Sequence, residues 1–286
     1  MTRVQIGHTP DADDAFMFFG INNGQSLPPD ISVEHLLLPM QNLNQMALQG
    51  HLEMTAFSFA TFAQVAHLYR PLPCGLSLGF ATGPMLVVRP GTTLEQVRQG
   101  RVASPGSLTS AHWLTLMWNP DQQFSEVPFD QVLTRLLDGE VCAALVIFEA
   151  QMRLAELGCQ MALDLGHWWH QETQGLPVPL GLNGVRRDLP LELQVKLGGA
   201  LRDSIQLALD HPQEALDQAL PLARGLERSK TLEFVNRYVH RSTLDLGPGG
   251  RLAVAEFYRR SQTCGLLEKT LEIDWLPLDG EVPGGK

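Results

Sequence analysis

The densest group of ionisable side chains lies in the polar loop His8–Phe18, where Asp11, Asp13 and Asp14 fall within four positions. The loop follows an apolar run and precedes a helical pattern, and ligands of open α/β sheets bind where strands end. Asp13 or Asp14 at a helix start can instead act as an N-cap, accepting from free N–H groups and opposing the helix dipole. Three carboxylates exceed what capping requires. We therefore expect at least one of them to face a ligand.

Two further segments place hydroxyl side chains where a strand ends and a helix begins. Ser58 lies within Ala56–Ala60, and Thr109 and Ser110 lie within Ser104–Ala111. A helix start offers free N–H groups that bind anions, although a plain N-cap explains Ser58 equally well. Because the two helix starts fall in different predicted domains, we expect them to face each other across one cleft.

Other chemistries find little support in the sequence. No G-x-S-x-G motif is present, so a serine hydrolase is disfavoured. His167 and His170 lie on a Trp-rich helical segment and are interpreted as surface and core-edge residues rather than metal ligands. The four cysteines lack C-x-x-C spacing and are expected to be reduced, mostly buried thiols. The sequence thus predicts neither a metal ion nor a cofactor.

Short β-type runs alternate with helical patterns through the first half of the chain, which indicates α/β architecture with mostly parallel sheets. The first series is expected at Val4–Gly7, Asp14–Asn22, Ile31–Leu38, Gln41–Gln49, Glu53–Phe57 and Phe59–His67. A second series is expected at Met85–Val88, Arg101–Ala103, Thr109–Trp118, Glu126–Phe129, Asp130–Leu137 and Cys142–Ile147. Four amphipathic helices are then expected at Leu189–His211, Gln213–Ala223, Ser229–His240 and Gly250–Cys264.

Two segments punctuated by Pro and Gly, 83–88 and 177–181, are predicted to carry the chain between two domains. Domain one is expected to comprise residues 1–87 and 178–286, and domain two residues 88–177. The C-terminal helices need a surface to cover, and the first sheet is the obvious one. The fold class is therefore α/β, with two domains, an inter-domain cleft and a helical C-terminal segment packed on domain one.

Composition narrows the possible partners. The chain has 286 residues, of which 44% are hydrophobic and 18% charged, which is enough apolar material for folded cores. Its net charge is −10 and it contains no basic run, so a nucleic-acid partner is excluded. Neither a signal peptide nor an apolar span of membrane length is visible, which predicts a cytoplasmic protein without a membrane partner. Local helix starts can still bind a small anionic substrate.

Several blocks, taken in order, resemble the 1,4-dihydroxy-6-naphthoate synthase family, which processes cyclic de-hypoxanthine futalosine on the futalosine route to menaquinone. The resemblance runs from Ile6 to about Gly265. Its blocks are Gly7–Phe18, Leu43–Gly50, Ser58–Ala60, Gly83–Pro84, Leu108–Ala111, Asp164–Trp169 and Gly175–Gly181. The resemblance implies a two-domain fold of the periplasmic-binding-protein type, type II-like. It also implies a lyase whose substrate is bound by Asp14, Ser58, Thr109, Ser110 and Ala111.

The chain departs from this family at one position. Relatives carry a histidine after the apolar strand, and that residue resembles the general base of the eliminating step. Here the position is Phe148, which cannot transfer a proton. His8 and His112 are the candidate replacement bases, and Phe148 is then a substrate-binding wall residue. The alternatives are a non-catalytic binding protein that kept the site and lost the base, and an enzyme like chorismate dehydratase.

Overall fold

The computed structural model describes residues 1–147, 149–269 and 271–278. Contacts divide the chain into two compact units. Unit 1 comprises Met1–Ser77, Gly181–Gly247 and the described residues from Leu271 onward, and unit 2 comprises Leu78–Leu180 and the described residues of Pro248–Thr270. The predicted boundaries at 87 and 178 stay a prediction. The contacts put the first division earlier, and they assign residues 248–269 to unit 2.

The sheet of unit 1 brings the ends of its central strands together. Its strands are β1 (Thr2–His8), β2 (Ile31–Leu37), β3 (Met54–Ser58), β4 (Tyr69–Pro71), β5 (Ser77–Gly79) and β11 (Val178–Arg186). They are ordered β2-β1-β3-β11-β4, with β5 paired to β11. β1 is parallel to β2 and β3, whereas β11 is antiparallel to β3 and β4. The carboxyl ends of β1, β2 and β3 therefore lie at the same end of the sheet.

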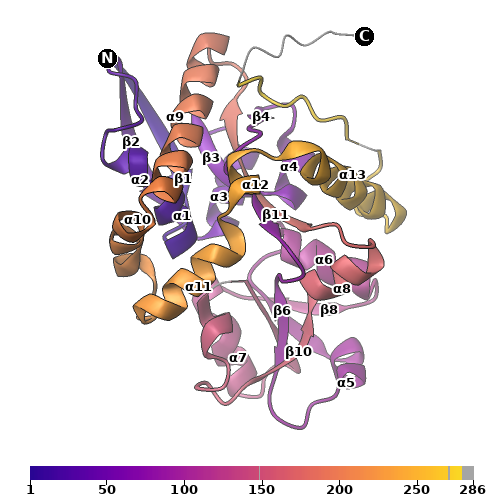
Figure 1. Cartoon of the computed structure of the whole chain (residues 1–286). Coiled ribbons are helices and arrows are strands. Elements are labelled where there is room, and N and C mark those ends of the chain that lie inside the picture. The colour runs from indigo at the N-terminus through magenta and orange to yellow at the C-terminus, as the bar shows by residue number, and fades with distance from the viewer. Residues whose placement is uncertain (148, 270, 279–286) are drawn as a thin grey trace. The chain divides into compact units, whose positions relative to one another are not determined.

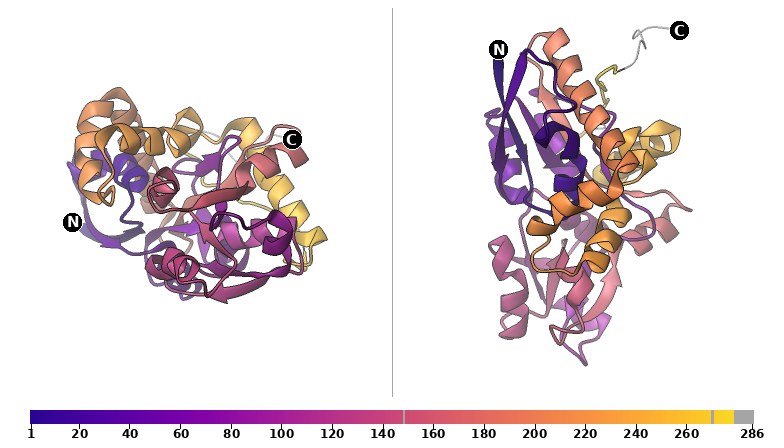
Figure 2. Two further views of the ribbon diagram at one scale, coloured as in Figure 1. Left: turned by 90° about the horizontal axis from the view of Figure 1, so that it is seen from below. Right: turned by 60° about the vertical axis from the view of Figure 1, so that its left-hand side comes forward.

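Helices from both ends of the chain pack together on unit 1. They are α1 (Ala12–Met17), α2 (Phe19–Asn22), α3 (Met40–Leu48), α4 (Phe59–Val65), α9 (Leu191–Asp210), α10 (Pro212–Ala219), the 3-10 turn η3 (Leu220–Leu222), α11 (Arg228–Tyr238) and α12 (Arg241–Leu244). α9 packs on α1 and α2, and α10 and α11 pack on α1 (Figure 1). The right-hand view of Figure 2 shows these orange helices beside the indigo strands β1 and β2. The expected packing of C-terminal helices on domain one is confirmed for α9 to α11, whose contacts are made with α1 and α2.

One serine fastens α9 to the N-terminal helices. Ser204 Oγ donates to the Met17 carbonyl oxygen at 2.7 Å and accepts from the Gly20 amide at 2.9 Å. A Cβ on Gly20 would lie 2.8 Å from the Ser204 Cα, so glycine permits this close approach. This contact holds α9 against the end of α1 and the start of α2.

Unit 2 is built around a second sheet, ordered β10-β6-β9-β7-β8. Its strands are β6 (Met85–Val88), β7 (Arg101–Ser104), β8 (Gln123–Glu126), β9 (Ala143–Val146) and β10 (Gln160–Asp164). Its helices include α5 (Leu94–Gln99), α6 (Ser110–Trp118), α7 (Val132–Leu137), α8 (Leu165–Glu172) and the 3-10 turns η1 (Phe129–Gln131) and η2 (Glu149–Arg153). β7 is parallel to β8 and β9, whereas β6 is antiparallel to β9 and β10.

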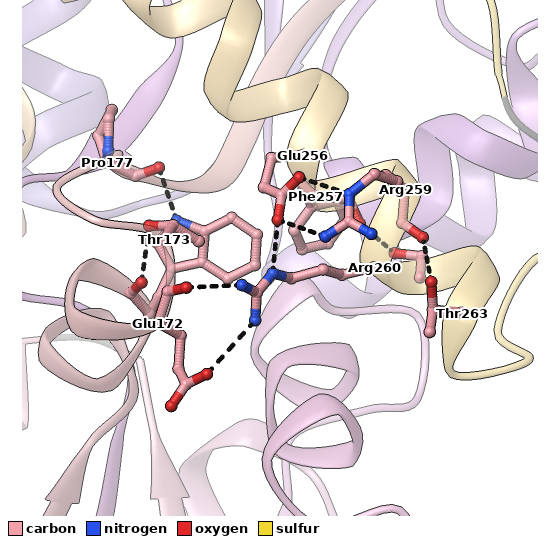
Figure 3. Close-up of polar contacts among 10 residues, drawn as sticks. Glu172, Thr173, Pro177, Glu256, Phe257, Arg259, Arg260 and Thr263 are labelled. Atoms are coloured by element: carbon pink, nitrogen blue, oxygen red, sulfur yellow. Dashed lines mark hydrogen bonds and ion pairs between the residues drawn. The ribbon is translucent and has the colours of Figure 1, made fainter.

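The last helix, α13 (Gly247–Thr263), packs within unit 2 and not on the first sheet as expected. Phe257 stacks parallel to Trp113 of α6 and lies 6.1 Å from the Trp169 ring of α8, measured between ring centroids. Arg260 donates to the Glu172 carbonyl oxygen at 2.7 Å and covers the Trp169 ring (Figure 3). These aromatic and cationic contacts explain why α13 belongs to unit 2.

Element boundaries differ most from expectation in the shortest strands. The strand expected at Glu126–Phe129 is found at Gln123–Glu126, and Phe129 already lies in a 3-10 turn. The three-residue strands β4 and β5 were not predicted, because alternation over so few positions gives no usable signal.

Candidate functional site

Asp14 is held at the carboxyl end of β1 by the loop that precedes it. Its Oδ2 accepts from the Thr9 amide at 2.6 Å and from the Thr9 hydroxyl at 2.8 Å. The residue is only 7% exposed. Asp11, and not Asp13 or Asp14, occupies the N-cap position of α1. Neither Asp13 nor Asp14 is therefore the N-cap residue, although both lie in the first turn, where a carboxylate opposes the helix dipole. Asp14 is oriented by its bonds to Thr9.

The environment of Asp14 disfavours its charged form. Burial raises the pKa of Asp14 from 3.8 to about 6, although the two hydrogen bonds from Thr9 lower it. The nearby Asp11 carboxylate raises it further. A carboxyl whose pKa approaches neutrality can bind an anionic group when protonated and can accept a proton when ionised.

Arg224 joins this acidic loop from a distant part of the chain. Its Nη2 donates to Asp11 Oδ1 at 2.7 Å, and the Asp11 side chain makes no capping bond to α1. Arg224 has a φ of 50°, in the left-handed region that is costly for a residue with a side chain. Sequence reasoning missed this residue because the contact spans 213 positions.

His8, one of the two candidate bases, is fully engaged inside unit 1. Its Nδ1 lies 3.2 Å from the Thr9 carbonyl oxygen, to which only an N–H can donate, so the neutral ring accepts at Nε2 from His35 Nδ1 at 3.0 Å. The ring also stacks on Phe18 with 4.2 Å between centroids. Burial, followed by the charge of His35, lowers the pKa of His8 to about 3. His8 is therefore neutral at physiological pH.

Ser58 ends β3, next to β1 in the sheet, and precedes α4. Its amide donates to Asn44 Oδ1 at 2.9 Å, and its Oγ accepts from Asn44 Nδ2 at 3.2 Å. Ser58 occupies the N-cap position of α4, as expected, but its hydroxyl makes no capping hydrogen bond to that helix. Asn44 was missed as a site residue, although it lies within one of the blocks that carry the family resemblance.

Thr109, Ser110 and Ala111 lie at the start of α6 in unit 2. Thr109 is the N-cap: its hydroxyl accepts from the His112 amide at 3.2 Å and donates to the Gly106 carbonyl oxygen at 2.8 Å. Ser110 Oγ donates to the Leu180 carbonyl oxygen at 2.6 Å, and Ala111 is buried beside it. The structure thus places these three residues at one helix start. Their role in binding a substrate stays a prediction.

His112, the second candidate base, follows in the same helix. Its Nδ1 shares a hydrogen bond with Ser104 Oγ at 2.9 Å, and its ring stacks on Phe124 with 3.9 Å between centroids. Burial lowers the pKa of His112 to about 4, against the raising effect of the Glu126 charge. Among the described residues, no hydrogen-bond partner reaches its Nε2.

Phe148 lies outside the described residues. In the described part of the chain, no three or more His, Cys, Asp or Glu side chains gather closely enough to hold a metal ion. His167 shares a hydrogen bond with Gln171 one turn along α8, in an exposed position. Within the described ranges, no helix is both long and apolar enough to cross a bilayer.

Comparisons with solved structures place the fold. A crystal structure of a protein from Archaeoglobus fulgidus matches with a TM-score of 0.86 and 35% identity, covering 93% of this chain and 98% of that one. A Candida albicans protein described as having the generic periplasmic-binding-protein fold matches with a TM-score of 0.73 and 13% identity, covering 98% and 99% of the two chains. The chain has this fold, as the sequence predicted.

Comparisons of sequence place the family. A protein of Thermus thermophilus named 1,4-dihydroxy-6-naphthoate synthase is 36% identical over 266 residues, which cover 93% of this chain and 96% of the relative. The family model described as menaquinone biosynthesis matches residues 4–263. The match spans both units and includes every residue considered above for the site, so the chain belongs to the menaquinone biosynthesis family.

Proposed function

We propose that the chain is a 1,4-dihydroxy-6-naphthoate synthase, a cytoplasmic carbon–carbon lyase that converts cyclic de-hypoxanthine futalosine to 1,4-dihydroxy-6-naphthoate on the futalosine route to menaquinone. One observation carries the proposal: the 36% identity to the Thermus thermophilus synthase over almost the whole of both chains. Similarity of that extent retains a substrate class more readily than similarity in fold alone.

The substrate is proposed to be a small anion bound by residues of both units. In unit 1, Asp14 and Ser58 follow neighbouring parallel strands, where ligands of α/β sheets bind. In unit 2, Thr109, Ser110 and Ala111 begin α6, whose N-terminus carries a partial positive charge that attracts anions. Phe148 is proposed as an apolar residue that contacts a ring of the substrate.

His112 is the better supported of the two candidate bases. Both ring nitrogens of His8 are used in hydrogen bonds, whereas only Nδ1 of His112 is. When His112 Nδ1 donates to Ser104, the lone pair of Nε2 is available to accept a proton. A neutral imidazole is the form a base requires, and burial, which lowers the pKa of His112 to about 4, keeps the ring neutral at physiological pH while making it a weaker proton acceptor.

The activity is tested by incubating the pure protein with cyclic de-hypoxanthine futalosine and detecting the naphthoate by chromatography. We expect product with the wild type and its loss in His112→Ala. Chorismate in a parallel incubation should be left unchanged. If chorismate is consumed and the futalosine derivative is left unreacted, the chain is a dehydratase and not the proposed lyase.

The second candidate function is a non-catalytic binding protein, and one observation favours it. The family resemblance implies a histidine base at the position of Phe148, and a phenyl ring cannot transfer a proton. Such a protein would bind cyclic de-hypoxanthine futalosine in calorimetry without forming product. Product formation by the wild type excludes this function.

A further inference from the structure

Asn44 of α3 contacts Ser58 with both atoms of its amide group. Its Oδ1 accepts from the Ser58 backbone N–H at 2.9 Å, and its Nδ2 donates to the Ser58 Oγ at 3.2 Å. Asn44 is 0% exposed and Ser58 is 3% exposed. Asn44 is therefore shielded from solvent, and the two hydrogen bonds to Ser58 connect it to the end of β3.

The chemistry of the donors fixes the direction of both hydrogen bonds. A backbone N–H only donates, so the amide atom that faces it is the oxygen of Asn44, and the other amide atom is the nitrogen. That nitrogen only donates, so the Ser58 Oγ accepts. The Ser58 hydroxyl proton is not used in this pair, and no other hydrogen bond of Ser58 Oγ exists among the described residues.

We propose that Asn44 is a positioning residue that holds the Ser58 hydroxyl as a hydrogen-bond donor, aimed at an acceptor oxygen of the bound substrate. The inference rests on the proposed function for the identity of that substrate. A carboxylate or carbonyl oxygen fits this donor, whereas an ammonium or amide N–H does not. Asn44 thereby adds specificity for ligands that present an oxygen acceptor to the end of β3.

The substitution Asn44→Asp tests the direction of the hydrogen bonds with almost no change in volume. An ionised carboxylate still accepts from the Ser58 amide, but it also accepts from the Ser58 hydroxyl and so removes the donor from the substrate. We expect an increase in KM of about 10-fold, the effect of losing one neutral hydrogen bond, with a smaller change in kcat. Ser58→Ala should raise KM by a similar factor.

The pH dependence of Asn44→Asp provides a second readout. Once protonated, the introduced carboxyl can donate to Ser58 again, so KM relative to wild type at the same pH should recover as the pH falls. The elements with the most contacts to α3 are β1, β3 and α4, and Leu36 of β2 packs on the apolar cluster that contains Leu43 of α3. The titratable side chains on these elements are Arg3 and His8 of β1 and Glu34 and His35 of β2, and all four are present in the wild-type reference. An unchanged KM at every pH would overturn the inference.

A double-mutant cycle separates positioning from a general loss of stability. Asn44→Leu, Ser58→Ala and the double variant are compared, and the double variant should be no worse than the worse of the two single variants. The control is Asn183→Leu, which removes another buried amide of unit 1, one that donates to the Gly75 carbonyl oxygen. The control should lower stability and leave KM unchanged. Additive effects of Asn44 and Ser58 would contradict the inference.

Amide hydrogen exchange tests the positioning contact without any substrate. Exchange of the Ser58 amide should become at least about 10-fold faster in Asn44→Leu, after correction for global stability, and remain unchanged in Asn183→Leu. Unchanged exchange in Asn44→Leu would overturn the inference. If the wild type fails to bind cyclic de-hypoxanthine futalosine while exchange responds as expected, the proposed function is wrong and the positioning of Ser58 by Asn44 stands.

Discussion

Two carboxylates three positions apart have opposite environments. Asp11 is paired with the guanidinium of Arg224, whereas Asp14 is buried and, among the described residues, accepts only from the neutral Thr9. Burial without a cation raises the pKa of Asp14 to about 6. A group held in this way costs stability at neutral pH, which is characteristic of residues retained for binding or catalysis.

Asp14→Asn should stabilise the protein at neutral pH. The pKa of Asp14 is higher in the folded chain than the unfolded value of 3.8, so the wild type loses stability as the pH rises from about 4 to about 6. Asparagine keeps an oxygen that accepts both bonds from Thr9 and carries no charge. Urea unfolding should show a gain of about 2–3 kcal/mol at pH 7.5 that disappears near pH 4. A gain independent of pH would contradict the raised pKa.

Arg224→Gln should raise the pKa of Asp14 further. Without the guanidinium, the Asp11 carboxylate is no longer neutralised, and its charge disfavours ionisation of Asp14 more strongly. Carbon-13 NMR titration of the aspartate carboxyl groups measures the shift directly, with the Asp14 signal identified by its absence in Asp14→Asn. Arg228→Gln serves as the control, because Arg228 pairs with Asp217. Equal Asp14 titration in both variants would show that Arg224 has no such role.

Some of these site residues could be predicted from the sequence and others could not. Asp14 and Ser58 were singled out because polar residues follow apolar strands, a pattern that is local. Arg224 and Asn44 were missed because they reach the site through tertiary contacts, 213 and 14 positions from their partners. No local pattern in the sequence distinguishes them from other exposed arginines or helical asparagines.

At the scale of elements, Arg260 makes the polar contacts that join α13 to α8, beside the ring contact of Phe257 with Trp169. Arg260 donates to Glu172 and to Glu256 and covers the Trp169 ring, and its side chain is mostly buried (Figure 3). Arg259, its neighbour, pairs only with Glu256 in the same helix and is exposed. The two arginines therefore differ in whether they connect elements.

Arg260→Leu should lower the free energy of unfolding by about 1–2 kcal/mol, since it removes a hydrogen bond between helices and a cation–π contact. Arg259→Leu is the matched control and should cost less than about 0.5 kcal/mol, because an exposed pair within one helix contributes little. Urea unfolding of the two variants at pH 7.5 makes the comparison. Equal losses would mean that Arg260 does not connect α13 to α8.

The helices of the C-terminal segment were predicted well as elements and less well in their packing. Hydrophobic spacing at 3.6 residues shows that α9, α10, α11 and α13 each have an apolar face. The spacing does not say which surface that face meets. α9 to α11 cover unit 1 as expected, whereas Phe257 and Arg260 commit α13 to unit 2.

At the scale of the whole molecule, the chain leaves unit 1 near β5 and returns to it within β11, so unit 2 is largely an insertion into unit 1. Each unit contributes a part of the proposed substrate site, and the family match extends across both. The two-domain fold was predicted mainly from the family resemblance, because the matching blocks lie in both units. The fold alone does not decide whether the chain is catalytically active, because activity depends on what replaces the histidine proposed to be lost at Phe148.

Phe148→His should raise lyase turnover, because it introduces a proton acceptor at the position where the family resemblance implies a histidine. A general acid or base contributes about 10²–10⁴-fold to a rate. A large increase in Phe148→His would therefore mean that His112 supplies little of this factor in the wild type. Steady-state rates of naphthoate formation by Phe148→His, by Phe148→Leu and by the wild type provide the measurement. A fall in rate with both substitutions would indicate that the phenyl ring itself is required.

The central claim, that this chain is a lyase, is tested most directly by a single-turnover experiment with wild-type protein in excess over cyclic de-hypoxanthine futalosine. Excess protein makes all the substrate bound, so that slow chemistry is observed separately from weak binding. We predict that the bound substrate is converted fully to 1,4-dihydroxy-6-naphthoate in one exponential phase, and that His112→Ala abolishes this phase. Substrate that binds stoichiometrically and is recovered unchanged would contradict the account.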